Sequence, residues 1–157
     1  MEQFIAQNGD VVLRLFLAVV LGTCIGAERI FVHKEAGMKT HALVAMGAAV
    51  FVLVSEELAK KYINLPGFNP AMIASQIIVG IGFLGAGSIM LQDSKLKGLT
   101  TASGLWVTAG IGMAAGFGLY GLAIIATIFI LLVFIAMIVI EKPIRKISGD
   151  EIDQPKS

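Results

Sequence analysis

The side chains best able to do chemistry lie at the edges of long apolar stretches of the chain. Glu28 and Arg29 close one such stretch, and Lys39, Thr40 and His41 open the next. Ionisable groups at membrane depth are costly and are therefore functional candidates by default. We expect Glu28 to pair with a cation from a neighbouring segment, Lys39 or His41 among them. For His41 we predict a hydrogen-bonding role, because a single histidine without a partner cluster is a weak metal signal.

A second group of polar residues follows later in the chain. Lys97, Thr100 and Thr101 precede or begin an apolar stretch, and we predict that they complete an inner-face polar cluster with the first group. Lys97 is a third candidate partner for Glu28, and either threonine could cap the helix that follows. Gln76 lies in the first turns of a glycine-rich stretch. A buried amide in lipid bonds across helices, so a structural role and a site role for Gln76 both stay open.

Catalytic and cofactor motifs find no support in the sequence. Residues 80–85 match the dinucleotide pattern G-x-G-x-x-G, but they lie inside an apolar run and lack the preceding strand that the pattern requires. The sequence shows no nucleophile with a base, no His/Cys cluster and no phosphate loop with a lysine. We therefore predict no enzymatic activity, no cofactor and no metal site.

The elements that position these residues are five apolar segments in a chain of 157 residues, of which 57% are hydrophobic and 15% charged. About 20 apolar helical residues cross a bilayer core. We predict an all-α integral membrane bundle of five transmembrane helices in residues 1–141, with a short cytoplasmic tail at 142–157. The expected spans are Val11–Ala27, His41–Val54, Ala71–Leu91, Thr101–Phe117 and Leu119–Ile140.

Basic residues are distributed unevenly between the two sides of this bundle. Nine fall in the connections after the first and third spans and in the tail, whereas only Lys60 and Lys61 fall on the other side. The positive-inside rule then places the N-terminus outside and the C-terminus in the cytoplasm. The remaining basic residue, Arg14, lies in the first span, and we expect its long side chain to reach the headgroups.

Small residues inside the spans predict close contact between helices. We expect spans one, three and four to form a tight bundle, Trp106 to lie in its core, and the fifth span to face lipid or a partner. The residues assigned to helix packing are Gly22, Gly26, Gly80, Gly82, Gly85, Gly87, Gly110 and Trp106.

Four motifs, in order along the chain, resemble those of the MgtC/SapB family of bacterial membrane proteins. Residues 21–29 (LGTCIGAER) are similar to L-G-x-x-I-G-x-E-R, and residues 36–44 (AGMKTHALV) to A-G-x-R-T-H-x-L-V. Residues 76–87 (QIIVGIGFLGAG) are similar to Q-V-V-x-G-I-G-F-L-G-A-G. Residues 98–106 (GLTTASGLW) resemble G-L-T-T-A-A-x-L-W. The motifs cover nearly the whole membrane domain.

The resemblance implies a multi-pass protein of the bacterial inner membrane with five helices and its N-terminus outside. Members are linked to growth in scarce Mg²⁺, survival inside host cells and acid resistance, and some restrain the F-type ATP synthase. Two departures matter. Lys39 replaces the usual arginine and lacks its planar fork, and the 16 residues after Glu141 indicate a short form without the soluble C-terminal domain.

These observations predict a small regulatory or accessory protein linked to magnesium homeostasis and to stress or host survival. Its expected partners are the bilayer, other inner-membrane proteins (the ATP synthase by resemblance) and further copies of itself, with no nucleic acid. The alternative is an oligomeric Mg²⁺ channel or transporter, and a weaker third interpretation is a purely structural anchor.

Overall fold

The computed structural model describes residues 2–62, 69–92 and 94–147, and these form five helices and one short hairpin. The all-α class is therefore confirmed. Three helices contain segments long and apolar enough to cross a membrane, namely Asn8–Phe31, Met38–Tyr62 and Tyr120–Glu141. The elements are α1 (Glu2–Phe31), α2 (Met38–Tyr62), α3 (Pro70–Gly87), β1 (Met90–Gln92), β2 (Lys95–Lys97), α4 (Leu99–Gly116) and α5 (Tyr120–Ile147).

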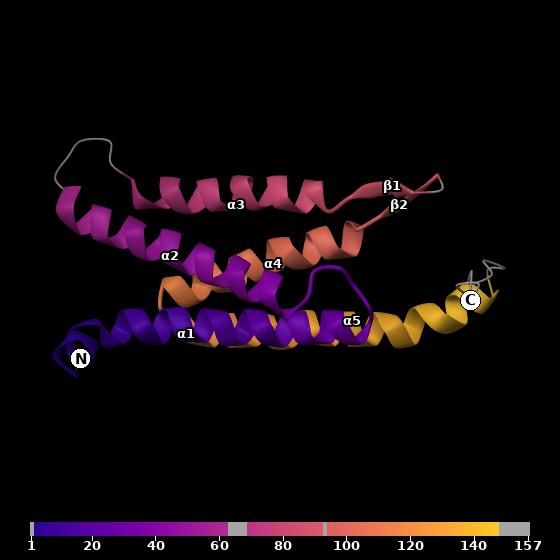
Figure 1. Cartoon of the computed structure of the whole chain (residues 1–157), viewed down its shortest axis with the longest axis horizontal. Helices are drawn as coiled ribbons and strands as arrows, with labels where there is room; N and C mark the ends of the chain where they lie inside the picture. Colours follow the sequence, from indigo (N-terminus) through magenta and orange to yellow (C-terminus); the bar gives the residue numbers. More distant parts are fainter. Residues whose placement is uncertain (1, 63–68, 93, 148–157) are drawn as a thin grey trace.

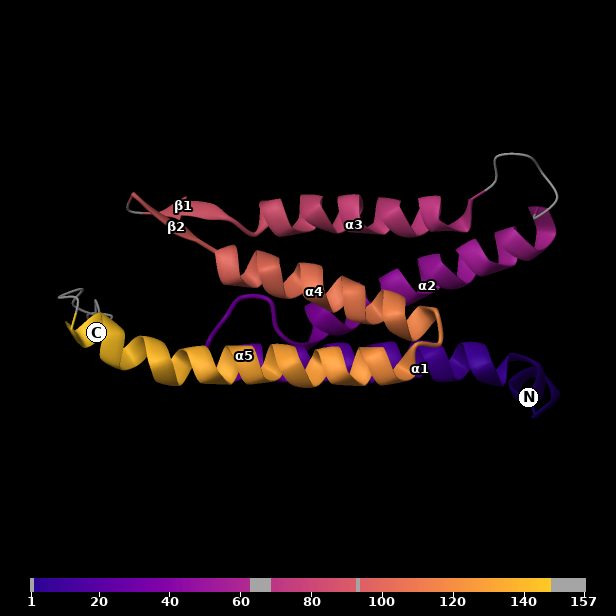
Figure 2. The ribbon, with the colours of Figure 1, turned by 180° about the vertical axis from the view of Figure 1, so that it is seen from behind.

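The five helices run along the long axis of the molecule and reverse direction at each connection (Figure 1). Helices α1 and α5 lie side by side, as the view from behind shows (Figure 2). Helix α3 lies at the opposite edge, and α2 and α4 lie between it and the α1–α5 pair. Helix α1 begins at one end of the molecule and α5 finishes at the other.

The helix boundaries differ from the expected spans at several points. Helix α1 begins at Glu2, α2 continues to Tyr62, and α5 continues to Ile147, which lies beyond the expected end at Ile140. Helix α3 begins at Pro70, one residue before the expected start at Ala71, because the Asn69 side chain accepts the Ala71 N–H at 2.9 Å and Pro70 occupies the first helical position. The rest of the predicted tail, residues 148–157, lies outside the described residues.

The third helix is shorter than its expected span, which ran to Leu91. It ends at Gly87, and the Ser88 hydroxyl donates to the Gly85 carbonyl at 2.7 Å. Residues 90–97 then form an antiparallel hairpin in which Met90 faces Lys97. The expected threonine cap of α4 is wrong, because the N-cap is Gly98 and no side chain caps this helix. Gly98 has φ +92°, and a Cβ there would lie 1.9 Å from the Ser88 carbonyl oxygen, so this turn requires glycine.

Helix α2, and not α3, is the central element of the packing. A Cβ added to Gly22 of α1 would lie 2.5 Å from the His41 carbonyl oxygen, and one added to Gly26 would lie 2.5 Å from the Met38 Cα. A Cβ on Gly112 of α4 would lie 2.1 Å from the Ala45 carbonyl oxygen. These glycines bring the backbones of α1 and α4 into close contact with α2.

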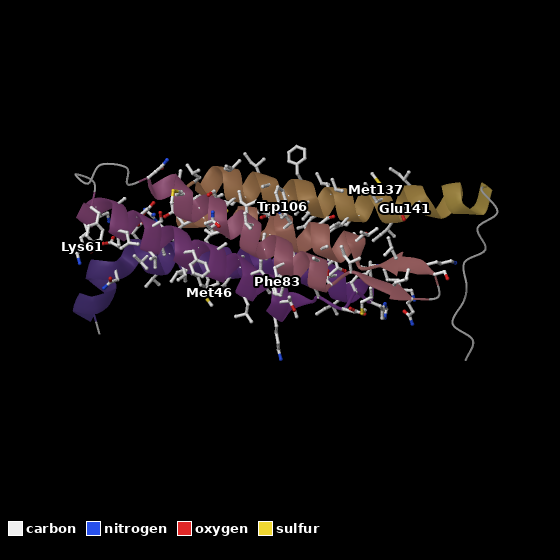
Figure 3. All side chains as sticks on the ribbon, turned by 90° about the horizontal axis from the view of Figure 1, so that it is seen from above. Met46, Lys61, Phe83, Trp106, Met137 and Glu141 are labelled. Carbon is white, nitrogen blue, oxygen red and sulfur yellow. The ribbon has the colours of Figure 1, made fainter. Side chains whose placement is uncertain are left out.

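The predicted bundle of spans one, three and four is therefore wrong. Helices α1 and α3 each pack on α2 and α4, but within the described part of the chain they do not pack on each other. Gly85 of α3 does contact α4, since a Cβ added to it would lie 3.6 Å from the Cβ of Ala102. The other assigned glycines of α3 and α4 have open space around them, so their expected packing role within one chain is wrong: Gly80, Gly82, Gly87 and Gly110. Trp106 is 53% exposed and does not lie in the core. Figure 3 shows side chains projecting along both long flanks of the molecule.

Candidate functional site

Polar side chains from α1, α2 and α4 meet near the end of α1, where the sequence placed its first group of candidates. Glu28 and Arg29 lie in the last turns of α1, where a cation is favoured by the partial negative charge of the helix end. Because Gly22 and Gly26 let the first turns of α2 approach α1 closely, His41 lies beside the same region.

Arg29 is buried and its charge is compensated by two groups. The side chain of Arg29 pairs through its Nε atom with Glu28, although the two are neighbours in the sequence. The guanidinium also lies over the Phe134 ring of α5, with its central carbon 3.4 Å from the ring centroid. The residue is only 2% exposed. The expected pairing of Glu28 with Lys39, His41 or Lys97 is therefore wrong.

His41 is fully buried, with an exposed fraction of 0%, and it is joined to α4 by a hydrogen bond. Its Nδ1 atom lies 2.8 Å from the Thr108 hydroxyl, which itself donates to the Gly104 carbonyl at 2.8 Å. A hydroxyl has one proton to give, so Thr108 accepts from His41 and Nδ1 carries a hydrogen. Gly104 leaves room for the Phe134 ring, since a Cβ there would lie 3.2 Å from Phe134 Cζ, whereas its 3.6 Å distance from His41 Cε1 would be an ordinary contact.

We call Glu28, Arg29, His41, Thr108 and Phe134 the Arg29 cluster. Within the described part of the chain, Glu28 Oε1 and His41 Nε2 are buried and make no hydrogen bond. Both atoms have lone pairs that can accept a proton or a hydrogen bond. Chemically, the cluster can hold a compensated positive charge and accept a donor, and it contains no nucleophile with an adjacent base.

The other predicted polar residues do not join this cluster. Lys39 and Thr40 are exposed, and with Gln76 of α3 they line a groove between α2 and α3. Lys97 is exposed on the hairpin and donates to the Gln92 side chain at 2.7 Å. Of the two threonines, Thr101 is buried and Thr100 is exposed.

A second network of polar side chains, not predicted from the sequence, lies at the opposite end of the bundle. Arg14 Nη1 donates to Glu56 Oε2 of α2 and to the Gly116 carbonyl at the end of α4, both at 2.8 Å. Its Nε atom lies 2.8 Å from Asp10 Oδ2, and the Tyr120 hydroxyl donates to Asp10 at 3.1 Å. The expectation that Arg14 reaches the headgroups is therefore wrong, because its side chain joins α1 to α2 and α4. Lys60, four residues after Glu56, pairs with Glu57 and leaves Glu56 to Arg14.

In the ranges that the structure describes, no three His, Cys, Asp or Glu side chains come close enough together to hold a metal ion. The links between helices at the two ends of the bundle are the His41–Thr108 hydrogen bond, the Arg29–Phe134 contact and the Arg14–Glu56 ion pair.

Comparison with known proteins gives a consistent result. The chain is 42% identical over 129 residues to YhiD of Escherichia coli, named "Putative magnesium transporter YhiD", and the match covers 81% of this chain and 60% of that protein. It is 48% identical over 120 residues to MgtC of Salmonella typhimurium (76% and 49%) and 44% identical over 116 residues to MgtC of Brucella abortus (74% and 46%). The chain spans about half the length of the curated relatives it matches.

No solved structure matches the chain. The model of the MgtC family matches residues 15–142, which include all of α2, α3 and α4 and most of α1 and α5. The matched segment contains every residue of the Arg29 cluster. The resemblance found in the sequence motifs is thereby confirmed, and the chain belongs to the MgtC family.

Proposed function

We propose that this chain is an accessory protein of the bacterial inner membrane, linked to magnesium homeostasis, that acts by binding another membrane protein. The observation that carries the proposal is the outward face of α3. This helix packs on α2 and α4, and its opposite side is left uncovered. The proposal assigns no catalytic reaction and no cofactor to the chain.

The outward face of α3 suits a second transmembrane helix. Phe83 is 81% exposed, and added Cβ atoms at Gly82 and Gly87 would meet nothing within 4 Å. Glycines on a helix surface allow a neighbouring backbone to approach closely in lipid, where packing rather than hydrophobicity drives association. A large exposed aromatic side chain beside them provides the surface that a partner would bury.

The proposal includes five transmembrane helices, with the N-terminus outside. Helices α3 and α4 each have 18 residues and are about 27 Å long, close to the bilayer core of about 30 Å. They lie alongside the three long apolar helices, so a membrane crossed by those three would be crossed by all five (Figure 1). Lys61 and Glu141 lie toward opposite ends (Figure 3). The excess of basic residues at the Glu141 end makes that end cytoplasmic by the positive-inside rule.

In this proposal the Arg29 cluster keeps the helices that carry α3 in a fixed arrangement. Glu28→Ala would leave the buried guanidinium of Arg29 without its carboxylate, which is strongly unfavourable in a membrane interior. We expect this variant to reach the membrane and to fail in function. Wild-type growth of cells carrying it at limiting Mg²⁺ would contradict the proposal.

The partner surface can be tested by photo-crosslinking in cells. A photoreactive amino acid at Phe83 should give a discrete protein adduct, whereas the same amino acid at Phe129 of α5, which is also exposed, serves as the matched control. Gly82→Leu should remove the adduct and reduce growth at limiting Mg²⁺, because the added side chain blocks close approach. Equal adducts from both positions, or unchanged growth with Gly82→Leu, would count against the α3 face.

A second candidate function, an oligomeric Mg²⁺ channel or transporter, is favoured by one observation. Gln76 is a polar side chain exposed on α3, within a segment expected to lie in the membrane, where polar groups face protein or water. The name of the Escherichia coli relative, a putative magnesium transporter, also supports this candidate. Several copies of the chain would have to surround a pore containing Gln76, and Gln76→Leu would then block the flux of Mg²⁺.

A further inference from the structure

A groove of about 810 Å³ lies between α2 and α3, with Ala109 of α4 in its floor. Its walls are apolar along most of their length, with Leu43 and Phe51 on the α2 side and Ile77 and Leu84 on the α3 side. The ribbons of α2 and α3 diverge toward the start of α2 (Figure 1). Among the described residues that line the groove, Lys39 is the only charged side chain and none is a carboxylate.

The length of the groove fits one acyl chain. Along α2 it extends from Lys39 to Phe51, which at 1.5 Å per residue is about 18 Å. A bilayer core of about 30 Å gives each leaflet a depth of about 15 Å. A second transmembrane helix would need a groove along the whole of α2, whereas a lipid tail entering from one surface needs only this half.

The mouth of the groove favours an anionic group. Lys39 and Thr40 lie in the first turn of α2, where no acidic residue is present. In the described part of the chain, neither the Lys39 ammonium nor the Thr40 hydroxyl makes a hydrogen bond or an ion pair. The first backbone N–H groups of a helix and its dipole also favour a phosphate at this position. Both side chains are exposed and therefore free to bind one.

We propose that the groove binds one anionic phospholipid, with an acyl tail along α2 and α3 and its phosphate on Lys39 and Thr40. Gly47 and Gly80 line the groove, and neither has an atom within 4 Å of an added Cβ, so both leave space that a tail can fill. Basic pockets between membrane helices on the cytoplasmic side are suited to anionic headgroups. The proposal uses the groove side of α3 and is independent of the accessory function assigned to its outward face.

Native mass spectrometry of the full chain tests the proposal. The chain would be equilibrated in micelles containing equal amounts of phosphatidylglycerol and phosphatidylcholine with identical acyl chains, so that only the headgroup differs. We expect the wild type to retain one lipid per chain and to prefer phosphatidylglycerol about fivefold, the factor expected from one lysine near an anionic group. Lys39→Gln should remove this preference.

Two pairs of variants distinguish a built site from general attraction. Gly47→Leu should abolish lipid retention by filling the groove, whereas Gly121→Leu on α5, also in open space, should not. Lys34→Gln is the control for Lys39→Gln, because Lys34 is exposed in the connection just before α2 but does not line the groove. Circular dichroism and gel filtration would establish that each variant is folded.

The opposite outcomes would overturn the proposal. Equal retention of the two lipids by the wild type would mean that the mouth does not select an anion. If Lys34→Gln lost the preference for phosphatidylglycerol as fully as Lys39→Gln, the preference would come from diffuse surface charge. Full retention by Gly47→Leu would place the lipid elsewhere, and a lipid-free dimer of the wild type would show that a second copy fills the groove.

Discussion

The guanidinium of Arg29 lies over the ring of Phe134, with its central carbon 3.4 Å from the ring centroid. This contact joins the end of α1 to α5 and covers a charge that, among the described residues, pairs with the carboxylate of Glu28 alone. A cation over an aromatic face in a desolvated position is stabilised by the ring quadrupole.

Phe134→Leu should therefore destabilise the protein by about 1–2 kcal/mol, because leucine keeps much of the volume and loses the interaction with the cation. Unfolding of the purified chain in mixed micelles with increasing denaturing detergent would measure the change. Phe129→Leu is the matched control on the same helix, since Phe129 is exposed. The interpretation is wrong if both substitutions have the same effect.

Thr108→Val should also destabilise the bundle, because valine has the shape of threonine and cannot accept the hydrogen bond from His41 Nδ1. A buried donor left without a partner costs about 1–3 kcal/mol. The same unfolding measurement applies, and Thr108→Ser, which keeps the hydroxyl, should stay close to the wild type. Equal stability of the valine and wild-type proteins would show that this hydrogen bond does not hold α2 to α4.

Gly112→Ala and Gly110→Ala should have opposite effects although they lie two residues apart. The Cβ at position 112 would lie 2.1 Å from the Ala45 carbonyl oxygen, so α2 and α4 must separate, at a cost of about 1–3 kcal/mol. The Cβ at 110 meets nothing within 4 Å, and alanine is the better helix former by about 1 kcal/mol. Thermal unfolding of the two variants would measure the difference, and similar midpoints would contradict the packing described above.

Glu56→Ala should lower stability by about 1–2 kcal/mol, since it leaves Arg14 with one carboxylate fewer in a partly buried position. Glu57→Ala is the control, because Glu57 pairs with Lys60 at an exposed position, where ion pairs contribute little. Unfolding at low and high salt would separate the two sites further. A larger loss in Glu57→Ala than in Glu56→Ala would rule out the Arg14 network as a link between helices.

The helices themselves could be predicted from the sequence, because long apolar segments separated by polar connections leave little choice in lipid. The start of α3 was also predictable, since the side chain of Asn69 and the ring of Pro70 act locally. The hairpin after α3 was not, because Met90 and Leu91 continue the apolar run and only the Ser88 cap and the pairing of the strands end the helix.

The inward face of α4 illustrates why packing was harder to predict. Two series of residues have the same spacing of four: one contains Gly110, and the other contains Gly104, Thr108, Gly112 and Gly116. Spacing alone does not say which series faces a neighbour. The second series faces α2, where Thr108 meets His41 and Gly112 meets Ala45.

Within the candidate site, Glu28, Arg29 and His41 stand out in the sequence as polar groups in apolar surroundings, and the structure brings them to one end of the bundle. It could not give their partners. In the sequence, Phe134 and Thr108 resemble any other residues of an apolar helix. Arg14 and Glu56, which form an ion pair, are 42 positions apart in the chain. Such contacts depend on how the helices are arranged, which no local pattern encodes.

Flux of Mg²⁺ into proteoliposomes containing the purified, inserted chain, measured beside empty liposomes, tests most directly whether the chain is an accessory protein or a transporter. The accessory function predicts flux equal to that of empty liposomes, for the wild type and for Gln76→Leu alike. Saturable flux that Gln76→Leu abolishes would contradict it and would make the chain a Mg²⁺ transporter.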